Sequence, residues 1–165
     1  MFQRIKKAKN ASSVEEAYNY ALRLLEFRFR GEDELRGKLT EKSFTPAVIH
    51  ATFAKLHEYK YVDDARLLEA LIRQYKEVGL YGPVYVKQKL LQRKFSSEQI
   101  NSALEDQYSA DDETLVAKQF LAKQKNIDLS DLKQKQRLMQ KFLRRGFRPS
   151  LVFKIFGQAN LDNED

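Results

Sequence analysis

Apolar residues recur at intervals of three or four positions along most of the chain, the spacing that places side chains on one face of an α-helix. In the first third of the chain, this pattern predicts helices over residues 14–30, 32–42 and 46–60. Ser13 and Thr45 stand where N-caps are needed, three residues before a glutamate and directly before a proline, respectively. No segment alternates apolar and polar residues as a half-buried strand does, so the chain is predicted to be all-α.

The three-helix pattern then recurs twice along the chain. Residues 35–53 align with residues 86–104 and again with residues 138–156, and an aromatic residue precedes each third helix as Phe44, Phe95 and Phe147. A helical period near 50 residues is typical of tandem repeats that bury their apolar faces partly against one another. The sequence therefore predicts three tandem three-helix, helix-turn-helix-like repeats in a short curved array. The expected divisions are a basic flexible arm at 1–13, repeats at 14–61, 62–110 and 111–159, and an acidic tail at 160–165.

Glycines and aspartates mark the predicted helix ends. Asp63 or Asp64 caps the helix that follows, and both carboxylates are interpreted as caps at the positive end of a helix dipole rather than as a catalytic pair. Gly31 is expected to provide a left-handed stop to the first helix, and Gly79 to terminate the fourth. The Gly82-Pro83 pair opens the next helix.

Composition and motifs argue against catalysis. The 165 residues contain no cysteine, and the histidines, His50 and His57, lie seven residues apart with no other metal-ligating residue patterned around them. The glycines occur singly, so no phosphate-binding loop is indicated, although Tyr81 could contact a ligand. The chain is expected to be no enzyme, and to need neither metal nor cofactor. With no signal peptide or membrane-spanning stretch in the sequence, it is expected to be cytoplasmic.

Basic residues are the strongest functional signal, since the formal net charge is +7. Each repeat carries a basic pair one turn apart on its second helix, and residues 133–154 contain eight Lys or Arg and no acidic residue. Such a cationic face favours a polyanion or an acidic protein surface, rather than a membrane, as the binding partner. For any single basic residue the alternative is a solvated position at a helix end, where a cation suits the negative end of the dipole. The candidate contact residues are Lys38, Lys42, Arg73, Lys76, Lys89, Arg93, Lys94, Lys133, Arg137, Lys141, Arg144, Arg145 and Arg148.

Three short motifs resemble the RecX family of bacterial regulators of the RecA recombinase. They are the segments EYKYVDDARL at 58–67, GLYGP at 79–83 and RRGF at 144–147. The structural motif residues in this comparison are Tyr61, Asp63, Asp64, Gly82 and Pro83, together with the repeated Phe44, Phe95 and Phe147.

The chain departs from the family pattern at three helix ends. The family commonly has glycine where this chain has Ser43, Lys60 and Lys94, and only Gly146 keeps the pattern. These substitutions are expected to affect how tightly the helices end.

The resemblance implies a protein that lies along a RecA filament on DNA and inhibits ATP hydrolysis, strand exchange and co-protease activity. It would thereby modulate recombinational DNA repair and the SOS response, by contact alone and as a monomer. The alternative is a general DNA-binding or architectural protein that acts directly on single- or double-stranded DNA. A nuclease would need clustered carboxylates for metal ions, and the acidic residues are scattered or at caps.

Overall fold

The structure, a computed structural model, describes residues 13–125 and 128–158. Within these ranges it contains nine α-helices and no strand, which confirms the all-α prediction. The predicted basic arm, apart from Ser13, and the predicted acidic tail lie outside the described residues. By their internal packing the described residues separate into two compact units. The first contains the residues up to Leu67 together with Arg93–Phe95, and the second contains the remainder.

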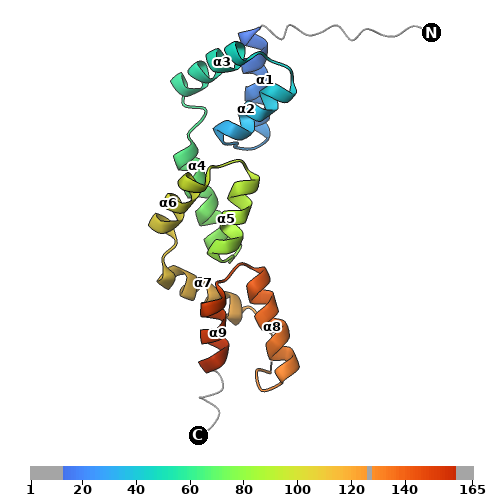
Figure 1. Ribbon diagram of the computed structural model, residues 1–165, viewed down its shortest axis with the longest axis vertical. Helices are drawn as coiled ribbons and strands as arrows, with labels where there is room; N and C mark the ends of the chain where they lie inside the picture. The colour runs from blue at the N-terminus through green and yellow to red at the C-terminus, as the bar shows by residue number, and fades with distance from the viewer. Residues whose placement is uncertain (1–12, 126–127, 159–165) are drawn as a thin grey trace, which may run out of the picture. The chain divides into compact units, whose positions relative to one another are not determined.

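The first unit is built on α1 (Val14–Phe27), α2 (Glu32–Glu41) and α3 (Pro46–Glu58) (Figure 1). Its three helices pack on one another around a core of aliphatic residues and one phenylalanine. The fully buried side chains at its centre include Leu35, Leu39, Phe53 and Leu56. These positions are the apolar ones that the helical spacing selects, so the core follows from the pattern.

Local capping explains where these helices begin. The Ser13 hydroxyl accepts from the Glu16 N–H at 3.2 Å, and the Thr45 hydroxyl accepts from the Val48 N–H at 3.4 Å. Both predicted N-caps are confirmed.

The two adjacent aspartates cap different helices. Asp63 accepts from the Arg66 N–H at 3.0 Å and caps the helix that follows it. Asp64 instead accepts from the Glu32 N–H at 2.8 Å, at the start of α2. There the N-cap is Gly31, which has no side chain and an extended backbone with φ −72°. The expectation that Gly31 provides a left-handed stop is therefore wrong: α1 ends at Phe27, and Gly31 begins the next helix.

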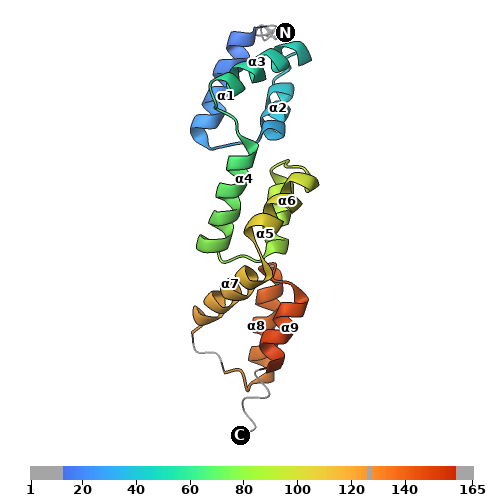
Figure 2. The same cartoon turned by 90° about the vertical axis from the view of Figure 1, so that its left-hand side faces the viewer.

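The second unit contains the rest of α4 (Asp64–Arg73), a π-helical turn (Gln74–Val78) and five further helices. These are α5 (Pro83–Gln92), α6 (Ser97–Gln107), α7 (Ala110–Ala122), α8 (Leu132–Arg144) and α9 (Pro149–Gln158). Figure 2 shows α8 and α9 side by side. Rings of α7, α8 and the residues that follow α8 pack together, with ring centroids 4.9 Å apart for Phe120 and Phe142 and 5.2 Å apart for Phe142 and Phe147.

Several helix ends use a residue with left-handed backbone geometry, and most of these residues are not glycine. Ser43, Lys60 and Lys94 have φ of 66°, 56° and 69°, and Gly146 has 79°. The three positions that depart from the family pattern thus keep the backbone geometry that glycine would adopt most easily. After α4, Gly79 has an ordinary φ of −78°, and the left-handed residue is Leu80 with φ 50°. The helix reaches Gly79 through the π-helical turn, which a local sequence pattern does not reveal.

The aromatic residue that follows two of these helix ends has the same structural role. The Phe44 N–H donates to the Leu39 carbonyl at 3.2 Å, and the Phe147 N–H donates to the Phe142 carbonyl at 3.3 Å. This is the last hydrogen bond of a Schellman motif, which brings an apolar residue against the final turn. Phe95 and Phe147 are 4% and 1% exposed, whereas Phe44 is only half-buried.

A candidate partner-binding groove

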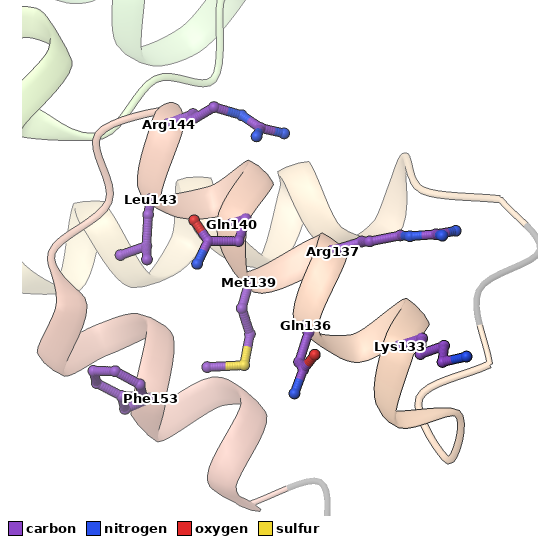
Figure 3. A pocket seen from close by; sticks show the side chains of 8 residues that line it. All are labelled: Lys133, Gln136, Arg137, Met139, Gln140, Leu143, Arg144 and Phe153. Carbon is purple, nitrogen blue, oxygen red and sulfur yellow. The ribbon is translucent and has the colours of Figure 1, made fainter.

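An open groove of about 620 Å³ runs along α8 on the side next to α9. Its lining consists of the cations Lys133, Arg137 and Arg144, the amides Gln136 and Gln140, and the apolar Met139, Leu143 and Phe153. All come from α8 except Phe153, which lies on α9. In Figure 3 the cationic side chains extend to one side of α8, whereas Met139 and Leu143 lie on the side that faces Phe153.

The helical period explains this sorting of side chains. At about 100° per residue, Lys133, Arg144 and Arg137 fall within about 40° of one another, although they span three turns of α8. Leu143 and Met139 lie about 100° and 140° from the centre of this cationic face, between the cations and the core residues Leu138 and Phe142. The helix therefore presents one buried face and one groove face that is apolar at one edge and cationic at the other.

The three cations of the groove are exposed and take part in no ion pair or side-chain hydrogen bond within the described residues. One of them, Arg137, interacts electrostatically with the carboxylate of Asp131, which is the N-cap of α8. The pKa of Asp131 is lowered mainly by a hydrogen bond from Gln134 and by the N–H groups of the first turn, with Arg137 adding a smaller effect. None of the described residues that line the groove is a carboxylate, so among them the positive charge of the cations is available to an external anion.

Lys141 and Arg145, two further predicted contact residues at the end of α8, point elsewhere. Lys141 donates to the Gln124 side chain at 2.5 Å and lies 5.6 Å from the Phe120 ring centroid. Arg145 is half-buried: its guanidinium donates to the carbonyls of Gly79 and Leu80 and lies 4.5 Å from each of the ring centroids of Tyr81 and Phe120. Because Lys141 and Arg145 follow Arg137 around the helix by about 40° and 80°, they leave the groove face and turn toward neighbouring segments.

The basic pairs of the first two repeats are partly engaged within the protein. Lys38 pairs with Glu41 at 2.7 Å, and that hydrogen bond is the main cause of its raised pKa. Lys42 and Lys89 lie over the rings of Tyr20 and Tyr85 at 5.6 Å and 5.3 Å. The second member of each pair follows or ends its helix, where a cation also suits the negative end of the dipole.

The remaining predicted contact residues divide into tethered and exposed ones. Lys76 donates to the Gln107 carbonyl at 2.7 Å and pairs with Asp112 at 3.2 Å. Arg148 pairs with the buried Glu113 at 3.2 Å, and the same carboxylate accepts the Arg148 N–H at 2.7 Å at the start of α9. Arg93 donates to the Phe29 carbonyl at 2.5 Å within the first unit. Arg73 and Lys94 are exposed, and no ion pair joins them to another described residue.

The motif residues serve the fold. Tyr61 packs edge-on against Tyr18, with ring centroids 6.4 Å apart, and Pro83 is buried at the start of α5. The Tyr81 ring stacks on Tyr85 at 4.0 Å, while the Arg145 guanidinium also lies over it. Tyr81 is thereby engaged within the second unit.

The described residues contain no cluster of three or more side chains that could hold a metal ion. His57 lies 3.1 Å from Glu32 on the exposed surface, and His50 is also exposed. No helix within the described ranges is long and apolar enough to cross a membrane.

Sequence reasoning missed the apolar half of the groove. The charge pattern singled out the cations of residues 133–154, and it did not mark Met139, Leu143 or Phe153 as surface residues. A signal was present in α9, where Val152 and Phe156 are buried and the adjacent Phe153 must then lie about 100° off that face. Gln136 and Gln140 carry no charge and could be placed only by the structure.

Comparisons with known proteins agree with the motifs. Residues 17–56 match the family model of the first three-helix domain of RecX, and residues 63–104 match that of the second. A relative from Halalkalibacterium halodurans, named "Regulatory protein RecX", is 27% identical over 165 residues, which cover 99% of this chain and 62% of the relative. A relative of the same name from Bacillus subtilis is 27% identical over 156 residues, which cover 92% of this chain and 58% of the relative. The chain thus spans about 60% of the length of these relatives.

Solved structures share the fold. The crystal structure of RecX from Lactobacillus salivarius superposes with a TM-score of 0.69 at 18% identity and covers 90% of this chain and 97% of that one. A second crystal structure of regulatory protein RecX gives a TM-score of 0.69 at 22% identity, covering 88% and 73% of the two chains. The relatives are named as regulatory proteins, in agreement with the expectation that the chain is no enzyme. From its two matched domains, its relatives and its fold, the chain belongs to the RecX family.

Proposed function

We propose that this protein is a non-enzymatic regulator that binds the RecA filament on DNA and inhibits its ATPase, strand-exchange and co-protease activities. It would thereby modulate recombinational DNA repair and the SOS response, acting as a monomer in the cytoplasm, where such filaments form. Membership of a family of regulatory proteins supports a role through binding rather than chemistry.

The observation that carries the proposal is the groove on α8. Lys133, Arg137 and Arg144 share one exposed face and have no ion-pair partner in the part of the chain that the structure describes. Lys76, Arg145 and Arg148, by contrast, are already held by internal acceptors. The groove therefore gathers charges that are free to attract an acidic surface, and this attraction weakens as salt is added.

The test is RecA-catalysed ATP hydrolysis on single-stranded DNA with this protein added at substoichiometric amounts. Wild-type protein should inhibit well below the concentration that coats the DNA. The triple variant K133E/R137E/R144E should need at least about tenfold more protein for the same inhibition, because each exposed charge reversal replaces attraction with repulsion.

The matched control is K118E/K123E/K125E, which makes the same change of net charge at exposed lysines outside the groove. It should inhibit nearly as well as wild type. If both variants lose inhibition equally, net charge rather than the groove is responsible, and the site assignment fails.

The net charge of +7 also supports the alternative, a general DNA-binding protein. In that case inhibition would appear only as the DNA becomes saturated. Following binding to the same DNA at the same salt concentration separates the two functions.

A further inference from the structure

The groove on α8 has an apolar half that phosphate or carboxylate binding alone does not explain. Phe153 is 61% exposed, although its neighbours Val152 and Phe156 are buried in the core. Met139 and Leu143 border the same space and are only partly covered. An exposed aromatic ring beside two accessible aliphatic side chains is typical of a surface that a partner covers.

The cationic half is a regular row. From the rise of about 1.5 Å per residue, Arg137 lies about 6 Å along the α8 axis from Lys133, and Arg144 about 10 Å further on. The row is thus about 16 Å long, or three helical turns. No acidic residue interrupts it, and Gln136 and Gln140 lie between the row and the apolar edge.

These two halves together specify one kind of occupant. A helix that carries carboxylates along one edge and apolar residues along the adjacent edge would place the carboxylates against the cationic row and an apolar side chain against Phe153. Within the proposed function, on which this inference rests, we infer that the groove binds an acidic amphipathic helix of a partner protein, with an apolar residue anchored between Phe153, Met139 and Leu143.

Single-stranded DNA fits the groove less well. Proteins that bind it place successive bases on several aromatic faces and track the phosphates with cations. Among the described residues, Phe153 is the one aromatic ring that lines this groove, and Met139 and Leu143 offer no face for stacking. An oligonucleotide would use the cationic row and leave most of the apolar half uncovered.

The first experiment uses designed probes. An alanine-based helical peptide of about 16 residues, with three glutamates spaced four and seven residues apart and leucines on the neighbouring face, is compared with its scrambled form and with an oligothymidylate of similar length. Binding is measured by fluorescence anisotropy against wild type, Phe153→Ala and Arg137→Glu. Phe153 is exposed, so its truncation leaves the core intact.

The helical peptide should bind at least about tenfold more tightly than the scrambled peptide, and Phe153→Ala should remove about tenfold of that affinity. Arg137→Glu should weaken both the peptide and the oligothymidylate, whereas Phe153→Ala should leave the oligothymidylate unchanged. Equal affinity for the two peptides would overturn the inference. So would a loss of oligothymidylate binding in Phe153→Ala, since the groove would then be a DNA site.

The same variants in the RecA ATPase assay separate this inference from the proposed function. If wild type fails to inhibit, the proposed function fails, and the peptide experiment still decides the groove chemistry. If wild type inhibits and Phe153→Ala inhibits equally, the inference is refuted while the proposed function stands.

Discussion

Gly82 and Gly146 meet backbone to backbone in the second unit. The Gly82 N–H donates to the Arg145 carbonyl at 2.9 Å, and the Val84 N–H donates to the Gly146 carbonyl at 3.1 Å. A Cβ atom on Gly82 would overlap the Gly146 carbonyl, and one on Gly146 would overlap the backbone of Tyr85. The end of α8 thus satisfies the first N–H groups at the start of α5, which requires that neither glycine carries a side chain.

Gly82→Ala should therefore destabilise the second unit by about 3 kcal/mol, since the added methyl group must displace main-chain rather than side-chain atoms. The free energy of unfolding in urea measures this. Gly37→Ala is the matched control, because nothing lies within 4 Å of a Cβ at that exposed position of α2. It should stabilise the protein by roughly 1 kcal/mol through helix propensity. The same sign of effect in both variants would contradict the backbone contact.

Lys94→Gly should stabilise the protein, by about 0.5 to 1 kcal/mol. Lys94 has φ 69°, where a side chain costs about 1 kcal/mol and glycine does not, although the freer unfolded chain offsets part of the gain. Lys118→Gly removes the same side chain from the interior of α7 and should cost about 1 kcal/mol. Thermal melts of the two variants should move in opposite directions, and a lower melting temperature for Lys94→Gly would argue against the left-handed geometry.

What the sequence predicted well was local. Helix starts follow from a capping side chain that accepts a hydrogen bond from an N–H group three residues later, so Ser13 and Thr45 could be identified from spacing alone. Caps supplied across the fold could not be predicted: Asp64 caps α2 from 32 residues away, and Glu113 accepts the Arg148 N–H from 35 residues away. Those contacts depend on tertiary packing, which no local pattern encodes.

The same limit applies to the groove. Helical periodicity placed Lys133, Arg137 and Arg144 on one face, as the structure has them. Residue type alone could not separate them from Arg145, which occupies the same helix but turns inward to backbone carbonyls.

The repeated phenylalanines should differ in their contribution to stability. Phe95→Ala and Phe147→Ala should each cost about 3 to 5 kcal/mol, because both rings are almost fully buried. Phe44→Ala should cost roughly half as much, since its ring is only half-buried. Urea denaturation of the three variants checks the order. A wild-type melt for Phe95→Ala would refute the alignment of the repeats.

Asp64 should make stability depend on pH in an unusual direction. Its pKa is raised from 3.8 chiefly by desolvation, against the opposing hydrogen bond from the Glu32 N–H. The folded state therefore holds the proton more tightly than the unfolded state, and the stabilisation present below pH 3.8 is lost as pH rises through the folded pKa. The unfolding free energy of wild type minus that of Asp64→Asn should fall over this window.

Asp112 provides the comparison of opposite sign. Hydrogen bonds from the Ser109 side chain and backbone lower its pKa below 3.8, so its stabilisation is present above that pH and lost as pH falls through the folded pKa. The corresponding difference for Asp112→Asn should rise with pH. If the two differences in unfolding free energy changed with pH in the same direction, the environments of Asp64 and Asp112 would not differ as described.

Arg144 and Arg145 should separate binding from folding. Arg145→Ala removes a half-buried guanidinium that holds the carbonyls of Gly79 and Leu80 and packs between Tyr81 and Phe120. The orphaned carbonyls and lost packing should lower the free energy of unfolding by about 2 to 3 kcal/mol. Arg144→Ala, one residue earlier and exposed, should change it by less than about 0.5 kcal/mol.

In the RecA assay, at a temperature where the variants are folded, a substitution at Arg144 should reduce inhibition more than a substitution at Arg145. Arg144→Glu should weaken inhibition, because its charge lines the groove, whereas Arg145→Lys, with the cation kept, should inhibit like wild type despite a lower melting temperature. If Arg145→Lys melts like wild type and loses inhibition, Arg145 itself contacts the partner. The binding surface would then extend from the α8 groove to the segment around Gly79.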